Sequence, residues 1–131
     1  MIGIVIVAHG GLAKEYLAAV EHVIGKQQGI HAISIAAECD REAKQEEICD
    51  AVDDVDQGDG VVVVVDMFGS SPSNLSMRAC NCAERQILYG ANLPMLVKLA
   101  SSREMPIEKA VEVSVQAGKK YMNTCSGNSA A

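Results

Sequence analysis

Short apolar runs alternate with stretches of helical periodicity along the first half of the chain. Residues 2–7 and 30–36 have the pattern of buried strands, and residues 61–65 are five valines in succession. An uninterrupted apolar run indicates a strand covered on both faces, which is typical of a parallel sheet. Between the first two runs, apolar residues recur at helical spacing over residues 12–24, and Gly25 is a plausible stop for that helix.

The helices expected in the rest of the chain each have a start signal. Asp40 is a candidate N-cap, and Ser71 followed by proline is typical of the start of a helix that we expect to reach about Glu84. Pro106 opens the last expected helix, and residues 95–99 are interpreted as a fourth strand. The inner faces are expected to carry Ile48, Val52 and Val55 in one helix and Ile107, Ala110, Val111 and Ser114 in another.

Strands that alternate with helices predict an α/β domain with right-handed crossovers. The expected fold is a parallel four-stranded sheet in the order 2-1-3-4, with four helices distributed over both faces. The 131 residues suffice for one such domain, which we place at residues 1–122. Residues 123–131 are small and polar, and we expect this tail to be flexible or to be ordered by a partner chain.

Composition and charge argue against several classes of protein. The formal charge of −6 makes nucleic acid and anionic membranes poor candidate partners. No apolar run approaches the ~20 residues of a membrane span, and residues 1–7 lack the basic start of a signal peptide. We therefore expect a cytoplasmic protein without membrane insertion. The five cysteines include no Cys-x-x-Cys pair, and we expect them to be reduced and mostly buried.

The candidate chemistry lies where the first and third strands end. Ligand sites in open parallel sheets lie beyond the carboxyl ends of the strands, where the strand order reverses. His9 follows the first strand and Asp66 follows the third, and these strands are neighbours in the common orders. A carboxylate that accepts a hydrogen bond from one imidazole nitrogen leaves the other nitrogen free as a nucleophile. We therefore expect His9 and Asp66 to face each other in one crevice.

A phosphoryl group is the reactant that the surrounding residues suit. Gly10 leaves room beside the imidazole, and the helix expected near Ser71 offers backbone N–H groups and the positive end of a dipole. Plainer readings stay open, because Ser70 and Ser71 could be turn residues only and Asp66 could cap a turn. Solvated side chains are expected at His22, His31, Asp53, Asp54, Asp56 and Asp59, so the sequence predicts no metal site and no cofactor.

Three motifs follow one another along the chain. The first strand ends in the pair His9-Gly10. Residues 66–74 are similar to the pattern Asp-x-x-Gly-Gly-Ser-Pro-x-Asn, with Ser70 in place of the second glycine, and residues 90–96 are similar to Gly-x-Asn-x-Pro-Met-Leu. In these motifs and their order the chain resembles the mannose-type IIA family of the bacterial phosphoenolpyruvate-dependent sugar phosphotransferase system. The resemblance covers roughly residues 1–120 and therefore the whole of the expected domain.

The resemblance implies a role for each of these residues and a set of partners. It implies that the phosphocarrier HPr phosphorylates His9, that Asp66 is the hydrogen-bonding partner of His9, and that a homodimer exchanges a C-terminal strand. The phosphate-binding residues that it implies are Gly10, Gly69, Ser70 and Ser71. The tail is a poor strand by composition, and no IIB domain follows it in this sequence. We therefore expect the acceptor to be a separate IIB protein or a regulatory target.

Other functions fit the sequence less well or stay open. A dinucleotide-binding enzyme needs Gly-x-Gly-x-x-Gly after the first strand, and residues 9–12 lack that pattern. A receiver domain needs an acidic pair for Mg²⁺ there, where this chain has Ala8-His9. The phosphotransfer subunit of dihydroxyacetone kinase shares the expected fold and phosphorylated histidine, although residues 68–74 resemble the mannose type more closely. A regulatory phosphorelay without sugar transport is also compatible with the sequence.

Overall fold

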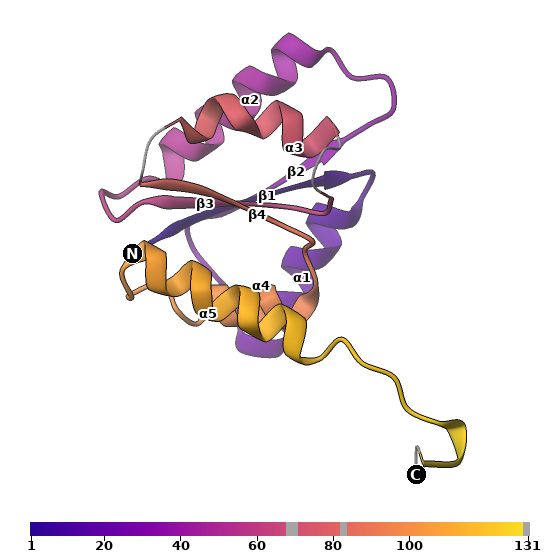
Figure 1. The fold of residues 1–131 in the computed structure, drawn as a ribbon. Helices are drawn as coiled ribbons and strands as arrows, with labels where there is room; N and C mark the ends of the chain where they lie inside the picture. The colour runs from indigo at the N-terminus through magenta and orange to yellow at the C-terminus, as the bar shows by residue number, and fades with distance from the viewer. Residues whose placement is uncertain (68–70, 82–83, 130–131) are drawn as a thin grey trace.

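The chain folds into a parallel four-stranded sheet between two layers of helices (Figure 1). The computed structural model describes residues 1–67, 71–81 and 84–129. The strands lie in the order β2-β1-β3-β4, which confirms the expected α/β class and strand order. They are β1 (Gly3–His9), β2 (Ile30–Ile35), β3 (Val61–Val65) and β4 (Arg85–Tyr89).

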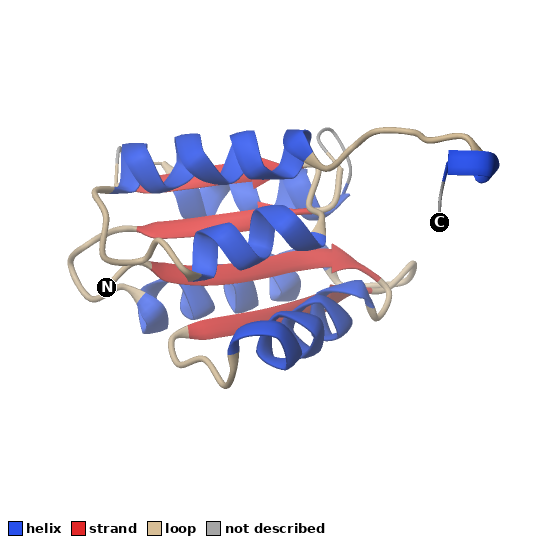
Figure 2. Ribbon diagram, turned by 90° about the horizontal axis from the view of Figure 1, so that it is seen from below, coloured by secondary structure: helices blue, strands red, loops and turns tan. Residues whose placement is uncertain are grey.

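The helices divide between the two faces of the sheet (Figures 1 and 2). One face is covered by α1 (Leu12–Ile24), α4 (Leu93–Ala100) and α5 (Ile107–Lys120). The other is covered by α2 (Arg41–Val55) and by α3 (Ser71–Ser76), which continues into a short 3₁₀ helix, η1 (Met77–Cys80). Both faces of the sheet are therefore removed from water.

Alternating side chains of the two central strands build a separate apolar layer on each face. Ile4 and Ile6 of β1 pack on the side of α1, α4 and α5, whereas Val5 and Val7 pack on the side of α2 and α3. The valines of β3 alternate in the same way, and each of the five is completely buried. This burial on both faces explains why residues 61–65 are apolar without interruption.

The sequence signals for α1, α2 and α5 are confirmed. Asp40 caps α2, since its carboxylate accepts hydrogen bonds from the backbone N–H groups of Glu42 and Ala43 at 3.1 and 3.3 Å. Gly25 ends α1 with a φ of 91°. The helix expected near Ser71 is α3. It begins at Ser71 itself, so this serine belongs to the first turn of the helix. The buried residues predicted for α2 and α5 are confirmed at Ile48, Val52, Val55, Ile107, Ala110 and Ser114.

The predicted position of the fourth strand was wrong. Residues 95–99 belong to α4, whereas β4 is Arg85–Tyr89, so the third helix does not reach Glu84 and the described residues contain five α-helices. The helix forms because the Asn92 side chain accepts a hydrogen bond from the N–H of Met95 at 3.0 Å and a proline occupies the first turn. An N-cap followed by proline is a helix start.

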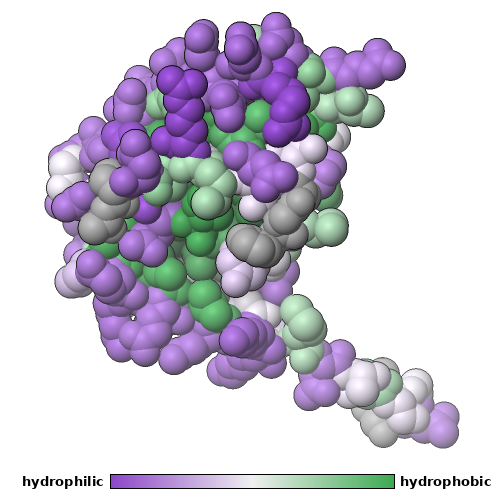
Figure 3. All heavy atoms as spheres, turned by 45° about the horizontal axis from the view of Figure 1, so that its top comes forward, coloured by the Kyte–Doolittle hydropathy of each residue, from purple (hydrophilic) through white to green (hydrophobic). Residues whose placement is uncertain are grey.

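The remaining sequence predictions concern the cysteines, the surface and the C-terminal tail. Cys39, Cys49 and Cys80 are half-buried, Cys125 is exposed, and Cys82 lies outside the described residues. Most of the surface visible in Figure 3 is hydrophilic, and the C-terminal segment leaves the body of the molecule. Its exposed residues end in a single 3₁₀ turn, Gly127–Ser129. Among the described helices, none has the length and apolar character that a bilayer crossing requires.

One buried arginine joins the amino ends of the first two strands. Arg103 is 5% exposed, and its Nε donates to the carbonyl of Ile2 at 2.7 Å. Its two terminal nitrogens donate to the carbonyls of Gln28 and Gly29. A buried backbone carbonyl without a donor costs free energy. This single side chain supplies donors to three carbonyls, of which that of Gly29 also accepts the N–H of Ile4.

We therefore expect Arg103→Ala to destabilise the protein by about 3 kcal/mol, because three carbonyls lose charge-assisted hydrogen bonds. Urea denaturation followed by circular dichroism measures this loss as a lower midpoint at an unchanged slope. Lys109→Ala is the matched control, since it removes the same charge from an exposed helix position. An equal effect of the two substitutions would show that the carbonyl contacts contribute little.

Candidate functional site

His9 and Asp66 meet at the carboxyl edge of the sheet. Strands β1 and β3 pair in parallel with Val7 opposite Val65, so the residues that follow emerge side by side. The imidazole Nδ1 of His9 lies 2.6 Å from Oδ2 of Asp66, and the backbone N–H of His9 donates to the same oxygen at 2.9 Å. The expected juxtaposition of the two residues is therefore present, although 57 positions separate them in sequence.

The environment of Asp66 keeps its carboxyl group ionised. Burial alone raises the pKa of Asp66, but hydrogen bonds from the backbone and imidazole of His9 and from the N–H of Met67 outweigh it. The net pKa is therefore lower than the ordinary value of 3.8. An ionised carboxylate can only accept hydrogen bonds, so Nδ1 of His9 must carry the proton in this contact. The neutral ring then has its lone pair on Nε2.

The imidazole is open to approaching reactants. The His9 side chain is 49% exposed, whereas the Asp66 side chain is 11% exposed. The next residue, Gly10, has a φ of 55°, which is a conformation that glycine adopts without steric cost. Its N–H donates to the carbonyl of Ile35 at 3.0 Å, which ties the turn after β1 to the end of β2. The imidazole of His9 therefore precedes a turn that is tied to the neighbouring strand.

A hollow of about 480 Å³ opens beside His9. Two residues that the sequence predicts as phosphate-binding, Gly10 and Ser71, line it together with His9. Gly69 and Ser70, the other two, lie outside the described residues. The remaining lining residues come from the end of β2 and the following loop: Ile35, Ala36, Ala37, Cys39 and Arg41. The structure therefore brings His9, Asp66, Gly10 and Ser71 to one edge, as the motif spacing predicts.

The contribution of the loop between β2 and α2 was not predicted. Arg41 and Cys39 line the hollow, and neither was singled out by the sequence patterns. The available signal was topological: β2 is the neighbour of β1, so the loop after β2 opens at the same carboxyl edge as His9. Since His9 pairs with Ile35, the residues after Ile35 start level with the imidazole.

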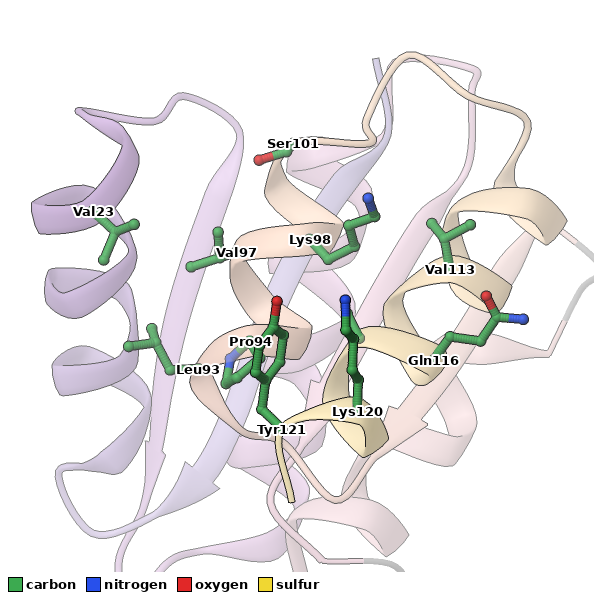
Figure 4. A pocket seen from close by; sticks show the side chains of 11 residues that line it. Val23, Leu93, Pro94, Val97, Lys98, Ser101, Val113, Gln116, Lys120 and Tyr121 are labelled. Atoms are coloured by element: carbon green, nitrogen blue, oxygen red, sulfur yellow. The ribbon is translucent and has the colours of Figure 1, made fainter. Parts of the chain in front are cut away.

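A larger hollow on the other side of the molecule lacks a histidine–carboxylate pair. It measures about 690 Å³ and lies between α1, α4 and α5 (Figure 4). Its walls are mainly apolar, with Val23, Val97 and Val113 contributed by the three helices (Figure 4). Neither a histidine nor a carboxylate lines it. The smaller hollow is therefore the candidate functional site, because it is lined by a histidine that a carboxylate orients.

The other histidines and the acidic residues form ion pairs away from this site or are exposed. His22 is exposed, and the Nε2 atom of His31 lies 2.7 Å from a carboxylate oxygen of Asp54. Arg85 lies 2.8 Å from Asp53 and 3.2 Å from Asp56. The acidic residues thus pair with side chains at the opposite end of the strands. Within the described ranges, no group of three or more His, Cys, Asp or Glu side chains could hold a metal ion.

The fold and the site together define an open α/β protein with a histidine held by a carboxylate at the carboxyl edge of its sheet. A family model described as "PTS system fructose IIA component" matches residues 3–116. The chain therefore belongs to this IIA family of the phosphotransferase system, which confirms the family resemblance of the three motifs.

Individual relatives agree with this membership. The mannose-specific EIIAB component of Escherichia coli K12 is 29% identical over 122 residues, which cover 91% of this chain and 38% of that protein. The chain thus spans well under half of that relative. A IIA protein associated with the fucose utilization operon of Streptococcus pneumoniae superposes with a TM-score of 0.80 at 26% identity, over 92% of this chain and 91% of that one. The mannose/sorbose specific IIA subunit of Enterococcus faecalis has the same fold, with a TM-score of 0.85 at 21% identity over 95% of each chain.

The lowered pKa of Asp66 predicts how stability depends on pH. A carboxyl group with a depressed folded pKa stabilises the fold above its unfolded pKa, and that contribution is lost as pH falls through the folded value. Asp66→Asn should therefore lower the free energy of unfolding at about pH 7 and have a smaller effect at about pH 3. Urea denaturation of both proteins at the two pH values measures the difference. A deficit of the variant that is equal at both would contradict the prediction.

Proposed function

We propose that this chain is a phosphocarrier that accepts a phosphoryl group from HPr on His9 and passes it to a IIB protein. The observation that carries the proposal is the 2.6 Å contact between Nδ1 of His9 and Asp66, which leaves Nε2 as the nucleophile on a half-exposed ring. Membership in the IIA family supports a phosphocarrier role within a sugar phosphotransferase system. The donor and the acceptor are part of the proposal.

The proposed transfer is a displacement at phosphorus. The lone pair of Nε2 forms a nitrogen–phosphorus bond while the bond between phosphorus and the donor atom breaks, and the donor atom keeps the electron pair. The proton on Nδ1 stays in its hydrogen bond to Asp66, whose negative charge stabilises the positive charge that develops on the ring. Passing the group to the acceptor reverses these changes, so His9 returns to its neutral tautomer.

The residues around His9 would hold the transferred group by positioning and charge stabilisation. Gly10 and Ser71 line the hollow beside the imidazole. We assign them, together with Gly69 and Ser70 of the same motif, to the oxygens of the phosphoryl group. The step as proposed uses no metal ion on this protein.

Mapping the phosphorylated residue tests the proposal. Incubation with phosphoenolpyruvate, enzyme I and HPr should place an acid-labile, base-stable phosphoryl group on His9, and His9→Ala should remain unlabelled. The labelled protein should then lose its phosphoryl group when an unphosphorylated IIB protein is added. Label on Ser70 or Ser71, or label retained in His9→Ala, would contradict the assignment.

Asp66→Asn is the informative second variant in the same assay. The amide side chain can also stabilise the tautomer whose proton is on Nε2, so the nucleophilic lone pair is lost for part of the time. The corresponding change in the serine protease triad lowers the rate by about 10⁴, which is an upper guide here because no proton has to be transferred. Labelling of Asp66→Asn at the wild-type rate would show that the carboxylate has only a structural role.

We also propose that the chain acts as a homodimer in which the C-terminal segment contributes to assembly. The described tail residues are exposed and extend from the end of α5 (Figure 1), as expected of a segment that contacts a second copy. Truncation after Tyr121 should therefore weaken the dimer, and light scattering over a concentration series measures the change. If the truncated protein dimerises as strongly as the full chain, the tail is not part of the dimer interface.

A further inference from the structure

One positively charged side chain lines the hollow beside His9. It belongs to Arg41, the first residue of α2, which follows the loop after β2. The other lining residues are His9, small or apolar residues, a cysteine and a serine. Arg41 is exposed, so its guanidinium can change position without disturbing the core. The hollow thus combines a nucleophile and a permanent positive charge.

The guanidinium of Arg41 has no recorded role in the packing of the described residues. Among the described residues, none forms an ion pair or a hydrogen bond with the Arg41 side chain. Two other arginines are fully engaged, since Arg85 pairs with two aspartates and Arg103 donates to three carbonyls. The nearby Lys44 pairs with Glu47 at 2.8 Å. Arg41 therefore keeps its donors available for a ligand at this edge of the sheet.

Two backbone donors at the start of α2 are already used. The Asp40 carboxylate accepts hydrogen bonds from the N–H groups of Glu42 and Ala43, which are donors that an anion would otherwise use. The same carboxylate adds a negative charge at the helix start and so repels an anion. The side chain of Arg41 carries the positive charge that can attract an anion to this place.

Charge balance identifies the ligand. Asp66 is ionised beside His9, and a phosphoryl group on the imidazole would add about −1.5 to −2 more. These negative charges repel each other in a half-exposed site. Arginine presents a planar fork of N–H donors that matches phosphate oxygens in pairs and stays charged at every physiological pH. Arg41, which has no ion-pair partner among the described residues, lines the same hollow and carries the opposite charge.

We propose that Arg41 binds the oxygens of the phosphoryl group carried by His9, and that this contact stabilises both the transfer and the phosphorylated state. The inference rests on the proposed phosphocarrier function and adds to it a residue outside the three sequence motifs. It assigns the start of α2, on the side of β2, to phosphate binding. The ligand is the transferring group itself and not a surface of the donor protein.

The test uses two phosphoryl donors, phosphorylated HPr and the small molecule phosphoramidate. In the second reaction Nε2 of His9 attacks phosphorus, the nitrogen–phosphorus bond of the donor breaks, and ammonia leaves with the electron pair. Arg41→Ala should slow labelling of His9 by both donors about tenfold and shorten the lifetime of the phosphohistidine. Arg41→Lys should recover part of the rate, because it restores the charge without the paired donors.

Arg78→Ala is the matched control. Arg78 is also exposed and its loss removes the same charge, but it lies on η1 and does not line the hollow. It should label at the wild-type rate with both donors, and thermal unfolding should show that all variants are folded. Equal labelling of Arg41→Ala and wild type would overturn the inference.

A loss confined to the reaction with HPr would also overturn it, because Arg41 would then contact the donor protein. If Arg78→Ala slowed the labelling of His9 by the same factor, the effect would come from the overall charge of the protein, and a specific contact of Arg41 would be rejected. If wild type is not labelled on His9 by either donor, the proposed function itself fails. If instead wild type is labelled normally and Arg41→Ala is labelled equally fast, the inference about Arg41 alone fails.

Discussion

The pairing of β1 with β3 is the constraint on which the site depends. Each strand is buried on both faces, and their register places Val7 beside Val65. A slip of one residue would turn the alternating valines and isoleucines toward the opposite layers, so packing on both faces fixes the register. The residues that follow the strands have no freedom to separate. The short contact between His9 and Asp66 therefore follows from packing at the centre of the sheet.

The central strands and the site pair could be predicted because their sequence signals are strong and agree with one another. Five consecutive valines have few alternatives to a buried strand, and a histidine and an aspartate after two such strands meet in a sheet of order 2-1-3-4. The loop after β2 could not be predicted in the same way. The position of Arg41 depends on how the chain turns between Ile35 and Asp40, and no motif marks that turn.

The error at the fourth strand has a physical explanation. Residues 95–99 are a short apolar run, and periodicity alone does not separate a buried strand from a buried helix of that length. The signals at the start of the segment distinguish a helix from a strand, because Asn92 caps α4. The side-chain amide of Asn92 also donates a hydrogen bond to the carbonyl of Gly118 on α5 at 2.9 Å. The true strand, β4, is at the sheet edge and starts with Arg85, so it is less apolar than the central strands.

The two ends of the sheet use charge for different purposes. At the amino ends of the strands, Arg103 satisfies carbonyls beside β1 and β2, and Arg85 at the start of β4 pairs with Asp53 and Asp56 from the end of α2. These contacts are complete in the folded chain, so they stabilise it and leave nothing for a ligand. At the carboxyl ends, the His9–Asp66 contact leaves one imidazole nitrogen free, and Arg41 has no partner among the described residues. Both side chains are in contact with water, so the fold does not need a ligand to satisfy them. Polar groups of this kind at one edge suit the proposed phosphocarrier, because the fold must be stable with and without the phosphoryl group.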